Sequence, residues 1–294
     1  MAAVVQRRLG LLNAAVSLAA LAGVVWWAAR QKAPHVPLRA DALAALAGAV
    51  ALYALTSALR AERWHRILVR NGIDRGRAEA YRLTAVGYMG NNTLPARAGD
   101  LLRVVLLGGS RRAALGTVVA ERLLDVVALA AIFAVVVLDR GLGFGPLPYL
   151  AAAGLLAVAI VAAAVRLSDK LSQAIRPVAA ASQELLSAHG AGLLALSVAL
   201  WAGEASVYLV VGLATDVHLG LSGALYVVAL TNLSALVPAA PGYVGTFDAA
   251  VLLALRSLGR PALGYLLVLR FVLFVPITVV GAAVYFTRYG RRRR

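Results

Sequence analysis

Two breaks rich in Pro, Gly and Asn interrupt otherwise apolar runs of this chain, at residues 91–100 and 231–242. Both contain the pattern Pro-Ala-x-x-Gly, with an Asn a few residues before the Pro. A helix in lipid satisfies its own backbone hydrogen bonds, so a break at membrane depth survives only where protein or water covers it. The two breaks therefore predict two polar sites inside a helical membrane protein.

Composition supports a membrane protein and excludes several other classes. Of 294 residues, 62% are hydrophobic and 14% are charged, whereas a soluble domain carries about 25% charged residues. The chain has no Cys, and its four His show no metal-binding spacing, so we expect no disulfide, metal site or cofactor. The net charge is +16, but the basic residues cluster between apolar runs and no recognition motif accompanies them, so we expect no nucleic-acid binding.

Six runs are long and apolar enough to span a bilayer, which takes about 20 residues. They are residues 11–29, 42–59, 113–138, 146–165, 190–214 and 263–286. A signal peptide is the alternative for the first run, but that run is longer than a usual signal core and no small-residue cleavage site closes it. The prediction is an all-α polytopic membrane protein with about six spanning helices and two re-entrant helical hairpins, one at each break.

The most basic segment, residues 60–82, follows the second run. With Trp64, Gly72 and Gly76 inside it, we expect an interfacial helix, a turn and a new helix start. Lys and Arg concentrate on the cytoplasmic side of membrane proteins. This predicts a cytoplasmic-membrane protein with both termini in the cytoplasm.

The predicted topology divides one integral membrane domain into two inverted repeats, residues 1–140 and 141–294, the second with a basic C-terminal tail. Each half has two spans, a hairpin and a third span. Three crossings reverse the orientation, so the hairpins enter from opposite faces and meet near the midplane, as in secondary transporters. The alternative is chance, because Pro-Ala-x-x-Gly is a weak motif in an Ala-rich sequence.

Ionisable residues at bilayer depth are costly unless paired or hydrated, so each is a functional candidate. The densest group is Glu121, Arg122 and Asp125, at spacings that let the Arg pair with the Asp. Packing alone needs no excess of negative charge, so we favour function over a structural cluster. Glu204 and Arg270 lie near the middle of the fifth and last runs.

Arg270 needs an anionic partner, which is Glu204, Asp248 or a lipid phosphate, since guanidinium matches phosphate oxygens well. At each break a new helix begins, and its free N–H groups favour an anion. The candidate headgroup-binding residues are Asn92, Arg97, Asp100, Arg103, Glu121, Arg122, Asp125, Glu204, Asn232, Thr246, Asp248 and Arg270. The residues expected to form the breaks are Pro95, Gly99, Pro238, Pro241, Gly242 and Gly245. No catalytic triad, P-loop or dinucleotide loop is present, so we expect no enzyme.

Three ordered motifs, at residues 92–103, 121–125 and 238–248, resemble the lysylphosphatidylglycerol synthase transmembrane region family, and the likeness extends over residues 38–286. This family is the flippase-like module of the multiple peptide resistance factor and also occurs free-standing in bacteria and archaea. Its breaks usually carry Glu where this chain has Asp100 and Asp248, which keep the charge but shorten the reach. We expect a free-standing member of this family, without the synthase domain.

The resemblance implies movement of an anionic or zwitterionic lipid between leaflets of a bacterial or archaeal cytoplasmic membrane. Aminoacyl-phosphatidylglycerol, another phospholipid, a hopanoid and a polyprenyl-linked glycan are the candidate substrates. We expect the headgroup between the breaks, with arginines at the phosphate and carboxylates at a cationic group or proton. The alternatives are a lipid-modifying transferase, with Glu121 or Asp125 as base, and an accessory protein that delivers lipid to a partner enzyme. The expected partners are membrane lipids and a separate lipid synthase or glycosyltransferase. The sequence leaves open whether the protein forms a homodimer.

Overall fold

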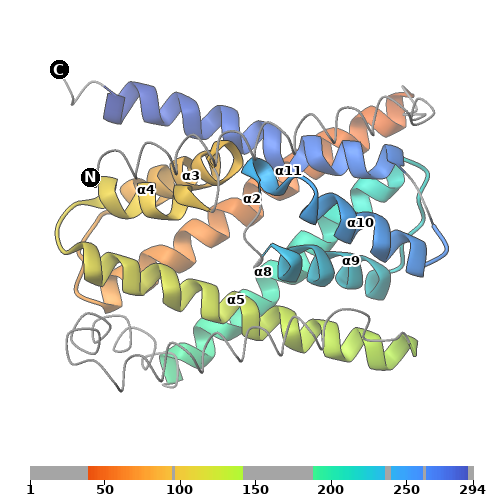
Figure 1. The fold of residues 1–294 in the computed structure, drawn as a ribbon, viewed down its shortest axis with the longest axis horizontal. Coiled ribbons are helices and arrows are strands. Elements are labelled where there is room, and N and C mark those ends of the chain that lie inside the picture. Colours follow the sequence, from red (N-terminus) through yellow and green to blue (C-terminus); the bar gives the residue numbers. More distant parts are fainter. Residues whose placement is uncertain (1–38, 95–96, 142–187, 236–239, 261–262, 291–294) are drawn as a thin grey trace, which may run out of the picture.

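A computed structural model describes residues 39–94, 97–141, 188–235, 240–260 and 263–290, and over these residues the chain is helical (Figure 1). The helices are α2 (Ala40–Arg70), α3 (Arg77–Thr93), α4 (Ala98–Leu107), α5 (Arg111–Arg140), α8 (Ala188–Ala214), α9 (Leu221–Ser234), η2 (Pro241–Tyr243), α10 (Thr246–Ser257), α11 (Leu263–Val284) and η3 (Tyr285–Tyr289). The predicted all-α class is confirmed. The spans expected at 11–29 and 146–165, and both Pro95 and Pro238, lie outside the described residues.

Among the described helices, three are long and apolar enough to cross a membrane, at Ala40–Arg70, Gly190–Ala214 and Leu263–Tyr289. Helix α5 has 30 residues, about 45 Å at 1.5 Å per residue. It also has the length to span, but it carries Glu121, Arg122 and Asp125 in its middle turns. A charged trio in the middle of a helix that crosses a bilayer would be costly, so the surroundings of these three residues decide whether their charges are satisfied.

Helix α2 corrects the expectation of a span that ends at residue 59 and a separate interfacial helix. It runs unbroken to Arg70 because Arg60 and Arg63 turn inward, where they are 4% and 0% exposed and pair with buried carboxylates. The turn predicted at Gly72 and Gly76 is present, and Gly72 adopts the left-handed conformation, with φ of 71°, that glycine tolerates best.

Each predicted break joins two short helices into a hairpin, α3 with α4 and α9 with α10. The four helices have 17, 10, 14 and 12 residues, so each falls short of the about 20 residues that cross a bilayer. In Figure 1 the two hairpins extend from opposite ends of the molecule, and their tips lie near its middle. This is the arrangement expected of two opposed re-entrant hairpins, although their placement relative to a membrane stays a prediction.

The helix after each hairpin carries an Arg that pairs back to the hairpin. Arg122 on α5 pairs with Asp100, and Arg270 on α11 pairs with Asp248, each 22 residues further along the chain than its partner. Both Asp residues lie in the first turn of the second helix of their hairpin. The matching spacing supports the predicted internal repeat, whose division at residue 140 stays a prediction.

Small residues allow the helices to approach closely, as is common in membrane bundles. A Cβ on Gly281 of α11 would lie 3.0 Å from the carbonyl carbon of Ala85 on α3 and closer still to its oxygen. Gly203 of α8 likewise faces Thr56 of α2, where an added Cβ would lie 3.1 Å from the methyl group. These contacts pack α2, α3, α8 and α11 around the hairpin tips.

Candidate functional site

The tips of the two hairpins touch each other. The Arg97 Nε donates a hydrogen bond of 3.0 Å to the Tyr243 hydroxyl, and its guanidinium carbon lies 5.5 Å from the centre of the same ring. The Asn92 carbonyl oxygen lies against Gly242. Asn92 is held by α11, because its side chain donates to Thr278 Oγ1 at 2.8 Å. The two breaks, which are far apart in sequence, therefore form one structural unit.

Both residues of that contact have unusual backbone conformations. Arg97 has φ of 56° and Tyr243 has φ of 55°, in the left-handed region that residues other than glycine enter rarely. Such conformations cost roughly 1 to 3 kcal/mol and cluster at functional sites. The strain at both tips marks their contact as a candidate site.

The carboxylates beneath the tips hold the hairpins to the spanning helices. Asp100 accepts from Arg122 Nη2 with both oxygens at 3.0 Å, and its backbone N–H donates to the Asn91 side chain at 3.2 Å. Asp248 accepts from the Gly245 N–H at 2.9 Å and from Arg270 Nη2 at 2.8 Å. Both Asp residues therefore anchor a hairpin to the helix that follows it, and Asp248 also caps the start of α10.

Arg270 also donates to the Gly242 carbonyl at 3.2 Å, and its guanidinium lies 5.0 Å from the centre of the Phe274 ring. Of the two carboxylates expected as its partner, Asp248 is the one it contacts. Thr246 donates locally to the Tyr243 carbonyl at 3.3 Å. Both residues therefore shape the second tip.

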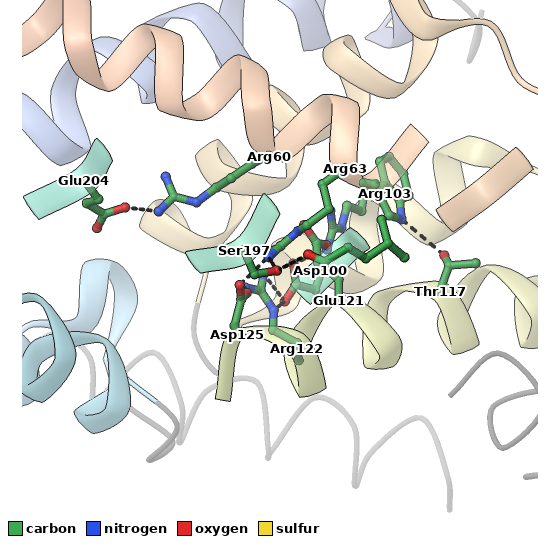
Figure 2. A network of polar contacts seen from close by, with 12 residues as sticks. Arg60, Arg63, Asp100, Arg103, Thr117, Glu121, Arg122, Asp125, Ser197 and Glu204 are labelled. Carbon is green, nitrogen blue, oxygen red and sulfur yellow. Dashed lines mark hydrogen bonds and ion pairs between the residues drawn. The ribbon is translucent and has the colours of Figure 1, made fainter. Parts of the chain in front are cut away.

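A buried ionic network links α2, α4 and α5 (Figure 2). Arg103 pairs with Glu121 at 2.6 Å, and Arg63 pairs with Asp125 at 2.8 Å and with Glu121 at 3.4 Å. Arg63 Nη1 also donates to Ser197 of α8 at 2.7 Å. The trio on α5 is therefore not left with excess negative charge, because α2 and α4 supply two arginines. Most of this network serves to fix the helices.

Glu204 has a buried partner of its own. It pairs with Arg60 of α2, as Figure 2 shows, and both side chains are 4% exposed. Its other oxygen accepts from Asn232 Nδ2 at 3.4 Å. The pair therefore connects α2 with α8.

A hollow of about 90 Å³, here called the tip cavity, lies where the hairpin tips meet α2, α5, α8 and α11. One water needs roughly 10 to 15 Å³ in such a space, so the hollow holds several waters or a compact polar group. Its wall combines charged groups with aromatic rings. The charged and amide residues of the wall are Arg60, Asn92, Arg97, Arg122, Asp125, Glu204 and Asn232.

A second hollow of about 340 Å³, here called the lateral groove, lies between α2, α3 and α11. It is mostly apolar and is lined by small residues of α2, such as Ala54 and Ala58, and by Ile277 and Val280 of α11. Tyr53 lines both hollows. The tip cavity, with its charged groups, and the apolar lateral groove therefore have one lining residue in common.

A family model described as lysylphosphatidylglycerol synthase TM region matches residues 12–281, nearly the whole chain. The chain belongs to this family. The resemblance inferred from the three motifs is thus confirmed, and the protein is a membrane protein of a family linked to lipid handling. Neither the curated proteins nor the solved structures with which we compared the chain gave a match.

In this member of the lysylphosphatidylglycerol synthase TM region family, the predicted site residues fall into three groups. The first group lines the tip cavity and comprises Asn92, Arg97, Arg122, Asp125, Glu204 and Asn232. The second group anchors the hairpins from outside its wall and comprises Asp100, Arg103, Glu121, Thr246, Asp248 and Arg270. The third group shapes the breaks, with Gly99 at the tight contact between α3 and α4 and with Pro241, Gly242 and Gly245 around η2.

From the sequence we did not predict that α2 and several aromatic residues line the tip cavity. Arg60 was assigned to a cytoplasmic interfacial helix, although it lies one turn before Trp64 and three residues after Ser57, on the buried stripe of α2. That periodicity was the available signal. The aromatic residues of the cavity wall that were not predicted are Tyr53, Tyr88, Trp201, Tyr208, Tyr243, Phe247 and Phe274.

Proposed function

We propose that this protein moves an amphipathic lipid between the leaflets of a cytoplasmic membrane. Its headgroup passes through the tip cavity, while the acyl chains stay in apolar surroundings. The observation that carries the proposal is the tip cavity itself. A hollow with charged and amide groups in its wall, at the contact of two interrupted helix pairs, is the kind of place in which secondary transporters hold their substrates.

The lateral groove supports an amphipathic substrate. A lipid needs polar groups around its headgroup and an apolar path for its chains, and Tyr53 lines both the tip cavity and the lateral groove. Burial of each CH₂ group contributes about 0.8 kcal/mol, so even part of one chain in the groove would anchor the lipid. The family supports the same substrate class, since it is linked to lipid handling.

Substitution of Arg97 by Gln should slow the transfer of phosphatidylglycerol between leaflets about tenfold. Arg97 lines the cavity and forms no ion pair with a carboxylate in the described part of the chain, so its charge is free for a phosphate. A hydrogen bond to a charged group contributes roughly 1.5 to 3 kcal/mol. The measurement is dithionite quenching of a headgroup-labelled lipid in liposomes that contain the purified protein.

Arg66→Gln is the matched control, because it removes the same charge from an exposed position on α2. Equal rates for Arg97→Gln and the wild type would contradict the proposed role of the cavity. Mass spectrometry of the same liposomes should show unchanged lipid species. Newly formed species would indicate a transferase instead.

Filling the lateral groove should slow lipid transfer without removing any charge. Ala54 lines the groove on the exposed side of α2, and a Phe there would occupy the space proposed for an acyl chain. Ala51→Phe adds the same volume one turn away and outside the groove. We expect Ala54→Phe to lower the dithionite rate severalfold and Ala51→Phe to leave it unchanged. Equal transfer rates in the two variants would indicate that the acyl chains do not occupy the lateral groove.

A further inference from the structure

Two buried donor nitrogens in the wall of the tip cavity have no hydrogen-bond partner among the residues that the structure describes. They are Nη1 of Arg60 and Nε1 of Trp201, on side chains that belong to residues only 4% exposed. A buried donor without an acceptor destabilises a protein, so native structures leave few of them. Both donors belong to residues that line one hollow, so an acceptor bound in that hollow is a candidate partner for them.

The neighbours of Arg60 hold it in place and still leave Nη1 free. Glu204 accepts from Nη2 of the same guanidinium, and the Asn232 amide holds Glu204 from the other side at 3.4 Å. The guanidinium carbon lies 5.0 Å from the centre of the Trp201 ring and 5.9 Å from that of Tyr88. The two unpaired donors are thus carried by groups already in mutual contact, which reduces the entropy that a ligand must remove on binding.

The charge of the cavity wall selects the kind of acceptor. Of the three arginines in the wall, Arg60 pairs with Glu204 and Arg122 pairs with Asp100, while the wall carboxylate Asp125 pairs with Arg63 of α2. Arg97 forms no ion pair with a carboxylate among the described residues, so its positive charge remains uncompensated in a hollow within an apolar bundle. A neutral ligand would leave that charge unmatched, whereas an anion balances it.

We propose that Arg60 and Trp201 form a subsite for a phosphate ester oxygen, with Arg97 across the cavity neutralising its charge. A phosphate mono- or diester offers several acceptor oxygens, which suit a guanidinium and a further N–H donor. This inference rests on the proposed function for the source of the ester, since a phospholipid headgroup carries one. A free phosphate has the same chemistry, and the experiment separates the two sources.

Trp64 supplies a matched control within the same chain. Its Nε1 donates to Thr117 Oγ1 at 3.1 Å, and the residue is fully buried away from the wall of the cavity. Trp201→Phe therefore removes a donor that no described residue uses, whereas Trp64→Phe removes an internal hydrogen bond. If Trp201 binds a ligand, Trp201→Phe lowers the affinity for that ligand and leaves thermal stability unchanged. Loss of the purely structural bond in Trp64→Phe has the opposite effect, lower stability at unchanged affinity.

The experiment measures binding to the purified full chain in a phosphate-free detergent, by native mass spectrometry and thermophoresis. The probes are phosphatidylglycerol, sn-glycerol 3-phosphate, inorganic phosphate and the phosphate-free lipid diacylglycerol. We expect Trp201→Phe to weaken phosphatidylglycerol binding about five- to tenfold at unchanged thermal stability, with diacylglycerol binding unchanged. Trp64→Phe should lower thermal stability and keep wild-type affinity. Arg60→Lys, which keeps the charge beside Glu204, should weaken binding at least as much as Trp201→Phe.

A loss of affinity for phosphatidylglycerol but not for the soluble phosphates supports a lipid headgroup as the ligand, and a loss for both supports any phosphate ester. Wild-type affinity of Trp201→Phe for every phosphate probe would overturn the subsite and assign both donors to water. Binding is measured without transfer between leaflets. The subsite can therefore stand if translocation fails, and translocation can stand if the subsite fails.

Discussion

Substitution of Arg63 by Ala should lower the free energy of unfolding by about 3 to 5 kcal/mol, the range found when one partner of a buried ion pair is removed. Arg63 lies on α2 and is fully buried. It contacts Asp125 and Glu121 of α5 and Ser197 of α8. Its loss leaves two carboxylates short of a counter-charge and also creates a cavity. Unfolding of the purified protein in mixed detergent micelles of increasing denaturing detergent measures the effect.

Arg66→Ala is the comparison for this prediction, because Arg66 lies less than one turn further along α2 but is 55% exposed. Its pair with Glu62 is of the surface kind and should contribute less than about 0.5 kcal/mol. A second comparison replaces one charge of each sign, as Arg63→Met with Asp125→Asn. This variant should be more stable than Arg63→Ala, since Arg103 keeps Glu121 and Arg122 keeps Asp100 as partners. If Arg63→Ala unfolds like the wild type, the network does not hold these helices together.

The apolar runs of the sequence predicted most of the helices because lipid imposes a simple length rule. The run at 190–214 corresponds to α8, and that at 263–286 to α11 with η3. Both breaks were correctly placed, since Pro and Gly end helices for local reasons. The hairpins that they join followed from the short apolar segments on either side.

Pairing within the site could not be read from the sequence in the same way. Arg60 meets Glu204 across 144 residues of chain, and Arg63 meets Glu121 across 58. Which charge meets which depends on how the helices pack, and no local pattern encodes that. The positive-inside rule also assigned both arginines to the cytoplasm, because it counts charges near the ends of spans and takes no account of the face on which they lie.

The charge balance around Glu121, Arg122 and Asp125 of α5 also could not be predicted from the sequence. Glu121, Arg122 and Asp125 were interpreted as an excess of negative charge because only their own helix was visible. In the folded protein Arg103 and Arg63 complete the network. The candidate headgroup contacts therefore narrow to the residues that line the tip cavity, among which Arg97 has no carboxylate partner in the described residues.

Substitution of Gly99 by Ala should abolish lipid transfer, because it separates the two helices that form the first tip. A Cβ at this position would lie 2.7 Å from the carbonyl carbon of Gly90 and closer still to backbone atoms of Gly87 and Asn91. Those atoms belong to the backbone of α3, so no side-chain rotation relieves the overlap. Relief requires α4 to move away, and α4 carries Asp100, whose pair with Arg122 fixes the tip.

Gly192→Ala makes the same chemical change on α8, at a helical position where an added Cβ meets nothing within 4 Å. It should leave transfer unchanged and stabilise the helix by up to about 1 kcal/mol. The dithionite assay gives the transfer rates, and the denaturing-detergent titration shows whether each variant is folded. If Gly99→Ala is folded but transfers no lipid, the close approach of α3 and α4 is needed for the activity itself, because the rest of the helix bundle remains folded without it. Wild-type transfer by Gly99→Ala would refute the tight tip, and with it the tip cavity as the path of the headgroup.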